Sequence, residues 1–128
     1  MYRFVDHTAE LELELESDSQ EGVLYEALRA FAELAANGAG DPSEREVVVA
    51  ARDLPGLLVA WLDELVFLAE TEGFVPETAE LSLAGSEVRA ALRGHVGEPR
   101  PLVKAVTLHR LRFRTENGVW RGRVVLDV

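Results

Sequence analysis

The sequence contains no cysteine, and its 13 basic residues include a single lysine, Lys104. Without cysteine the chain can form no disulfide, no thiolate metal site and no cysteine nucleophile. No apolar run approaches the roughly 18 residues of a membrane span, and no basic-then-apolar leader opens the sequence. We therefore expect a cytoplasmic protein that does not associate with membranes.

Self-contained enzyme motifs are also missing. The histidines at 7, 95 and 109 lack the H-x-x-x-H spacing of a helical zinc site, and there is no glycine-rich phosphate loop or G-x-S-x-G elbow. We therefore expect a protein that is not an enzyme. The alternative is a small metal-dependent hydrolase that would use Asp6, His7 and Glu10.

The net charge of −10 is unevenly distributed along the chain. Residues 1–80 carry a balance of −15, whereas residues 81–128 carry +5. An acidic domain repels nucleic-acid phosphates, although the basic segment 100–123 keeps a local contact open. The simpler interpretation is that acidic helices and arginine-bearing strands neutralise each other across one surface.

A length of 128 residues with 48% apolar residues predicts one domain, residues 1–128, with a substantial core. Asp18-Ser19-Gln20-Glu21 has the form of a capping box and predicts a helix that ends at Asn37-Gly38, before a loop over 38–43. Asp53 and Gly73 predict the ends of a second helix. Alternation and turn signals predict strands at 2–7, 10–16, 44–51, 74–84, 86–95, 102–114 and 119–127.

This order of elements predicts an α+β fold. We expect a single two-layer domain in which two helices pack on one face of a mostly antiparallel or mixed β-sheet. Asn117-Gly118 predicts a tight hairpin between the last two strands. Trp61 lies at helical spacing among leucines and is expected in the core.

Two polar features carry possible chemistry. One is Asp6-His7-Thr8-Ala9-Glu10 at the first strand junction, which is either a working site or the polar corner of a hairpin. The other is the end of the chain, where Asp127 and the α-carboxylate of Val128 stand side by side. Adjacent carboxylates without nitrogen or sulfur ligands suit hard cations, whereas a merely solvated Asp127 is the simpler interpretation.

These residues carry a family resemblance that runs through nearly the whole chain. The sequence resembles archease, the small protein that assists the RtcB-type RNA ligase of tRNA splicing and RNA repair. The resemblance rests on five stretches in order: Asp6-His7-Thr8-Ala9, Asp53-Leu54 through Trp61-Leu62-Asp63-Glu64-Leu65, Thr71-Glu72-Gly73, Val103-Lys104-Ala105-Val106-Thr107 with His109, and Asp127-Val128.

The resemblance implies an accessory protein that promotes metal- and GTP-dependent guanylylation and repeated turnover of the ligase. The ligase would be the partner, and tRNA would be met only through it. The resemblance also implies a divalent cation, calcium first and magnesium or manganese as alternatives, held by Glu10, Asp127 and Val128. The sequence departs from the family pattern at Glu10, where aspartate is usual.

Four further residues are candidates for supporting roles. Asp6 and His7 adjoin the implied site, and His7 is either a donor that orients a carboxylate or a structural histidine. Lys104 and His109 are candidate partner contacts, and their spacing of five places them on opposite faces of a regular strand. The alternative function is that of a general chaperone or modulator of nucleic-acid enzymes.

Overall fold

The computed structural model describes residues 1–7, 9–38 and 40–128, and it contains two helices and seven strands over those residues. Thr8 of the first polar feature and residue 39 of the expected loop at 38–43 lie outside the described residues. The elements are β1 (Tyr2–His7), β2 (Glu10–Ser17), α1 (Gln20–Ala35), β3 (Asp41–Ala50), α2 (Leu54–Glu72), β4 (Phe74–Ala84), β5 (Glu87–Val96), β6 (Ala105–Glu116) and β7 (Val119–Asp127).

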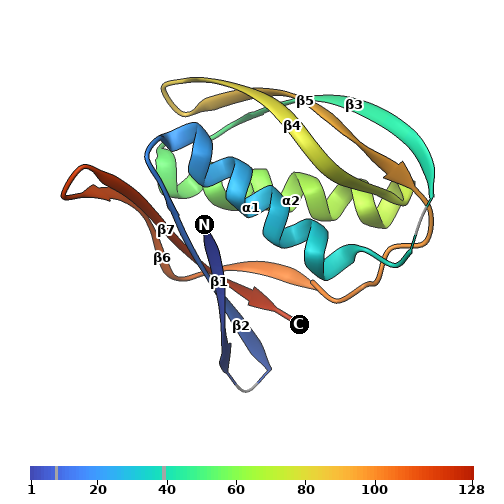
Figure 1. The fold of residues 1–128 in the computed structure, drawn as a ribbon. Helices are drawn as coiled ribbons and strands as arrows, with labels where there is room; N and C mark the ends of the chain where they lie inside the picture. Colours follow the sequence, from blue (N-terminus) through green and yellow to red (C-terminus); the bar gives the residue numbers. More distant parts are fainter. Residues whose placement is uncertain (8, 39) are drawn as a thin grey trace.

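The strands form two antiparallel sheets. One has the order β1-β2-β7-β6 and the other the order β3-β5-β4. Both helices contact strands of both sheets and lie in a layer between them (Figure 1). The α+β class and the antiparallel pairing are confirmed, but the expectation of a single sheet in two layers is wrong.

The apolar surface of α2 explains this third layer. Its buried residues include Leu57, Trp61 and Leu65, and Val59 and Val66, which point in other directions around the helix, are also partly buried. A helix that is apolar on more than one side needs cover on more than one side. A helix packed on one face of a single sheet, as expected from the sequence, would leave part of this apolar surface uncovered.

Local capping signals fix the helix ends. Ser19, not Asp18, is the N-cap of α1, because its Oγ accepts a hydrogen bond from the backbone N–H of Gly22 at 3.0 Å. The helix ends at Ala35, two residues before the expected Asn37. The predicted ends of α2 are confirmed, with Asp53 accepting from Gly56 N at 2.8 Å and Gly73 left-handed at φ 69°.

The strand pairing determines which side chains of the four-stranded sheet face the core. Leu13, Val124 and Phe113 of the four-stranded sheet lie on its helix-facing side and are buried. Both Asn117 and Gly118 have positive φ, as the predicted hairpin requires. Neither helix in the described part of the chain is long and apolar enough to cross a membrane.

The first residue is tied to α1 by a partly buried ion pair. The Met1 ammonium donates to Glu16 O at 2.8 Å and pairs with Glu26, which also accepts from Arg29 Nη1 at 3.1 Å. Burial raises the pKa of the Glu26 carboxyl, but the hydrogen bonds from Met1 and Arg29 outweigh burial and hold that pKa below its ordinary value.

We expect Glu26→Gln to lower the free energy of unfolding by about 1–2 kcal/mol at pH 7. Because the folded-state pKa of Glu26 is depressed, its contribution is present above the unfolded pKa of about 4.3 and is lost as pH falls through the folded pKa. Urea unfolding at pH 7, 5 and 3.5 measures this, with the exposed Glu80→Gln as control. A wild-type advantage that grew toward pH 3.5 would contradict the assignment.

Candidate functional site

The tip of the β1–β2 hairpin lies at one end of the four-stranded sheet (Figure 1). His7 pairs with Glu10 across the hairpin, and Ala9 in the connection has a φ of 60°. The strong alternation of leucine and glutamate in β2 sets which side chains face the helices. Leu11 and Leu13 face the core, and Glu10 and Glu12 lie on the outer face.

Glu10 and Asp127 lie directly opposite each other in the β2–β7 ladder. Side chains opposite each other in an antiparallel pair have Cβ atoms about 4.5–5.5 Å apart. Asp127 is exposed and Glu10 is half-buried. Neither carboxylate makes an ion pair or a side-chain hydrogen bond with another described residue, so two anionic groups face each other without a compensating positive charge.

The last two residues are held in place by the sheet and the core. The carbonyl of Asp127 accepts a hydrogen bond from the backbone N–H of Lys104 at 2.8 Å. Val128 is half-buried and packs against the hydrophobic core. The α-carboxylate of Val128 therefore follows Asp127 at the same end of the sheet as Glu10.

The donor set at this end fits a hard cation only with additional oxygens. No three histidine, aspartate or glutamate side chains gather to hold a metal within residues 1–7, 9–38 and 40–128. Two carboxylates and the α-carboxylate of Val128 supply oxygens alone, the ligands that calcium and magnesium prefer. Calcium takes about six to eight oxygens, so water would complete its coordination.

The structure separates the two candidate supporting residues of the hairpin. Asp6 pairs with Leu11 and, by alternation, lies on the opposite face from Glu10. His7 shares the face of Glu10, but its Nε2 lies 3.7 Å from Oε1 of Glu12. If His7 orients a carboxylate, the carboxylate is that of Glu12.

Lys104 and His109 are not on one regular strand. Lys104 precedes β6, next to Ala105, which pairs with Asp127. The ladder between β6 and β7 shifts between Thr107 and Arg112, and His109 lies in this interruption. Opposite faces cannot be inferred from a spacing of five once the strand is bulged.

Glu12 is the member of this region that the sequence analysis missed. It is one of the regularly alternating glutamates of β2, but it is only 7% exposed. Its Oε1 lies 3.3 Å from Nη2 of Arg110, in addition to its contact with His7. The partner is 98 positions away in the sequence, so no local pattern could have identified it.

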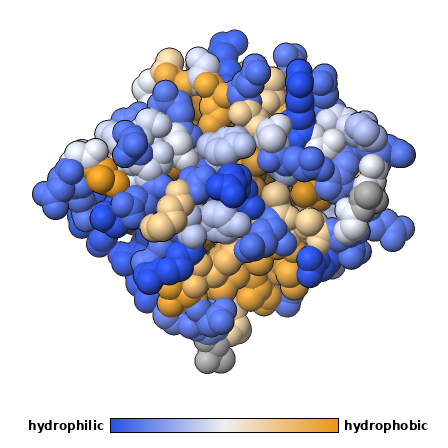
Figure 2. All heavy atoms as spheres, viewed as in Figure 1, coloured by the Kyte–Doolittle hydropathy of each residue, from blue (hydrophilic) through white to orange (hydrophobic). Residues whose placement is uncertain are grey.

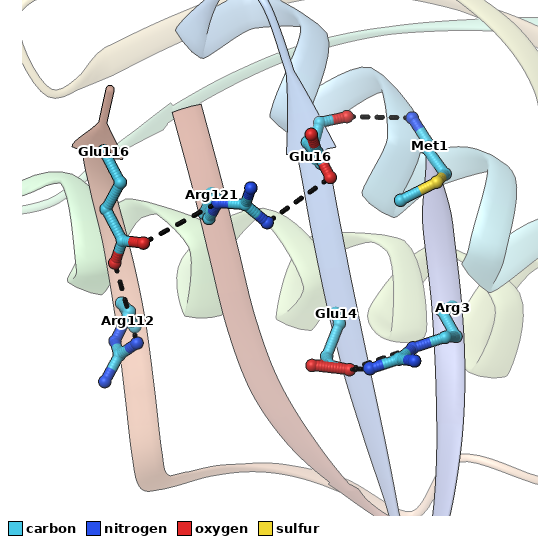
Figure 3. A network of polar contacts seen from close by, with 7 residues as sticks. All are labelled: Met1, Arg3, Glu14, Glu16, Arg112, Glu116 and Arg121. Carbon is cyan, nitrogen blue, oxygen red and sulfur yellow. Dashed lines mark hydrogen bonds and ion pairs between the residues drawn. The ribbon is translucent and has the colours of Figure 1, made fainter. Parts of the chain in front are cut away.

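The remaining outer face of the four-stranded sheet carries a network of glutamates and arginines (Figure 3). Arg3 pairs with Glu14, and Arg121 bridges Glu16 and Glu116. The hydrogen bond from Arg114, with the charges of neighbouring arginines, holds the pKa of Glu116 below its ordinary value. The neutralisation expected between acidic helices and arginine-bearing strands is found on this face between neighbouring strands instead.

The opposite side of the same sheet end is apolar. Phe4 and Leu11 are partly buried there, as is Val128 at the end of the chain. Figure 2 shows an apolar area in the lower part of the view, above the hairpin tip.

A cleft of about 360 Å³ lies between the two helices and the segment that follows β5, lined by residues such as Phe31, Val66 and Arg100. None of the predicted site residues lines it.

Comparisons with known proteins point to one family. The model of the archease protein family matches residues 2–128 of the chain. A curated archease from Methanopyrus kandleri is 33% identical to it, over 97% of this chain and 96% of its own length. A curated archease from Archaeoglobus fulgidus is 32% identical, over 99% of this chain and 98% of its own length.

Two solved structures share the fold. A solution structure of a Methanobacterium thermoautotrophicum protein has a TM-score of 0.78 at 27% identity and covers 99% of this chain and 98% of its own. A crystal structure described as an archease, possible chaperone, from Thermotoga maritima has a TM-score of 0.72 at 21% identity, over 100% and 98% of the two chains.

Proposed function

We propose that this chain, which belongs to the archease family, acts as an accessory protein of an RtcB-type RNA ligase. In this role it would promote the metal- and GTP-dependent guanylylation of the ligase and its repeated turnover. The family resemblance of the opening and closing motifs supports the proposal. The observation that carries it is the direct pairing of Glu10 with Asp127, without a counter-charge among the described residues.

The proposed site would hold a divalent cation, calcium first, by Glu10, Asp127 and the α-carboxylate of Val128. A bound cation would supply positive charge against the phosphates of a nucleotide on the ligase. The chain's own contribution would be positional. The β2–β7 ladder fixes where the two carboxylates stand, and the hydrogen bond from Lys104 N to Asp127 O fixes the end of the chain.

The outer sheet face supports tRNA contact only through the ligase. Arg112, Arg114 and Arg121 are all paired with Glu116. Arginines that already have a carboxylate partner are less able to bind phosphates, because binding would first have to break those pairs. Lys104 and His109 remain candidate contacts with the partner protein.

The direct experiment measures guanylylation of an RtcB-type ligase from the same organism, with GTP and a divalent cation. We expect substoichiometric amounts of this chain to accelerate guanylylation and to convert single ligation into multiple turnover. An unchanged rate at excess protein would contradict the proposal. Phosphatase or nuclease turnover by the isolated chain with magnesium would instead support the hydrolase alternative.

One glycine appended after Val128 should strongly reduce this acceleration, because it moves the α-carboxylate away from Asp127 while leaving both side chains unchanged. The measurement is the guanylylation rate at saturating protein, with circular dichroism to confirm folding. A glycine inserted in the exposed Asn117-Gly118 turn is the matched control, since it lengthens the chain equally away from the carboxylates. Full activity of the extended chain would remove Val128 from the proposed site.

A chaperone function is the second candidate, because the Thermotoga maritima relative in fold is described as a possible chaperone. A general chaperone should protect unrelated aggregating proteins, whereas a dedicated ligase cofactor should not. Light scattering of heated citrate synthase or insulin with and without the chain separates the two. Protection at stoichiometric amounts would favour the chaperone.

A further inference from the structure

Strand β6 leaves its ladder beside the proposed site. Between Thr107 and Arg112 the pairing with β7 shifts, so that residues 108–111, the β6 bulge, stand opposite a much shorter stretch of β7. Arg110 within the bulge has a φ of 54°, a left-handed conformation that is unfavourable for a residue with a side chain. Such conformations persist where surrounding contacts hold them, and they concentrate at functional sites.

Several contacts fix the β6 bulge. The carbonyl of Arg110 accepts a hydrogen bond from Nε of Arg123 at 3.0 Å. The guanidinium Nη2 of Arg110 lies 3.3 Å from Oε1 of the buried Glu12. The backbone N–H of His109 donates to Oγ1 of Thr107 at 3.3 Å. The bulge is therefore a fixed feature of the sheet, fastened to β7 and across it to β2.

The side chain of Arg110 reaches over the outer face of the sheet. Val125 pairs with Glu12 on one side and with Thr107 on the other, and it is fully buried although it lies on this outer face. The Arg110–Glu12 pair crosses β7 at this level. We attribute the burial of Val125 to this cover.

The bulge presents an apolar side chain to solvent. Leu108 is 70% exposed, the highest value among the large apolar residues in the described part of the chain. A single exposed leucine is ordinary on a protein surface. Leu108, however, lies in a segment whose left-handed residue Arg110 costs conformational free energy. Such strained segments cluster at functional sites.

The bulge lies close to the proposed cation site. Ala105 pairs with Asp127, and Leu108 follows three residues later, a separation of about 10 Å along an extended strand. Glu12 lies two positions after Glu10 on the same face of β2. A partner that meets Glu10 and Asp127 would therefore also cover the bulge.

We propose that the β6 bulge is a preformed contact element that inserts Leu108 into an apolar pocket of the partner ligase, with the Arg110–Glu12 pair as its positioning clamp. This inference rests on the proposed function. A protein partner fits better than a nucleic acid, because the exposed group is a leucine and the guanidinium of Arg110 is engaged by Glu12. Residues that contribute most to binding lie in well-packed, desolvated pockets at protein interfaces, although leucine is less common among them than tryptophan, tyrosine or arginine.

The first test is Leu108→Ser, with Val48→Ser as its matched control. Val48 is also an exposed apolar residue, at 58%, but lies on β3 in the other sheet. Burial of a leucine side chain predicts that Leu108→Ser raises the dissociation constant for the ligase, and the half-activating concentration, by about 10- to 100-fold. The maximal guanylylation rate should stay unchanged, and Val48→Ser should remain within about twofold of wild type.

The second test concerns the clamp. Arg110→Ala should weaken ligase binding and speed hydrogen exchange of the backbone N–H groups of residues 108–111, whereas Arg110→Lys, which keeps the positive charge, should restore part of both. A merely stabilising role would lower the thermal midpoint without a selective change of exchange in the bulge. That pattern would overturn the clamp.

The outcomes separate this inference from the proposed function. If the wild-type chain activates or binds the ligase and both serine variants behave alike, the bulge is not the contact and the inference fails alone. If the wild-type chain neither binds nor activates the ligase, the proposed function fails and the inference fails with it. If the chain self-associates and Leu108→Ser abolishes this in sedimentation, the surface serves a second copy of the chain, which also overturns the inference.

Discussion

Asp127→Ala is expected to abolish ligase activation while leaving the fold intact. Asp127 is exposed and makes no ion pair with the described residues, so its loss removes little folding energy. The substitution removes the Asp127 carboxylate opposite Glu10 in the β2–β7 ladder. A cation held by one fewer charged ligand binds much more weakly. The measurement is guanylylation and multiple turnover of the ligase at saturating accessory protein, with thermal unfolding in parallel.

Two further variants make this result specific. Asp41→Ala removes another exposed aspartate at the end of a strand, in the other sheet, and should leave activation unchanged. Glu10→Asp introduces the residue that the family resemblance implies at this position and should preserve activation, because both side chains present carboxylate oxygens. Equal loss in Asp41→Ala and Asp127→Ala would mean that general charge, and not the pair with Glu10, accounts for the effect.

The largest effect on stability is expected for Trp61→Ala. Trp61 is fully buried in the helix layer, and its Nε1 donates to the carbonyl of Leu24 at 2.9 Å, which joins α2 to α1. Truncation of a buried tryptophan costs about 3–5 kcal/mol, a large share of the roughly 5–15 kcal/mol typical of whole domains. Chemical denaturation measures the loss, and a chain unfolded at 37 °C is within the expected range.

The second tryptophan provides the comparison. Trp120 is only partly buried, in β7 near the hairpin, with its ring edge-on to Phe113 at 6.0 Å between centroids. Trp120→Ala should cost clearly less than Trp61→Ala. A smaller loss at Trp61 than at Trp120 would contradict the central place of the helix layer between the two sheets.

Features determined by neighbouring residues could be predicted from the sequence. The ends of α2 follow from Asp53 and Gly73, which act on the backbone within one helical turn. The β6–β7 turn follows from Asn117-Gly118, whose positive φ values match those the tight turn requires.

Features determined by distant contacts could not be predicted. No glycine, proline or asparagine marks residues 108–111, and the left-handed Arg110 is held by Glu12 and Arg123 through the folded sheet. The burial of Glu12 has the same origin. The second sheet could have been anticipated from the apolar residues around α2, which need cover on more than one side.

The cation that we propose to be held jointly by Glu10 and Asp127 is tested most directly by localisation of a paramagnetic ion. Manganese titrated into labelled wild-type protein should selectively broaden the NMR signals of Glu10, Asp127 and Val128, and excess calcium should reverse the broadening. In Asp127→Ala the same titration should leave these signals sharp. Broadening centred elsewhere on the acidic surface, or unchanged by the substitution, would contradict a cation site between these two strands.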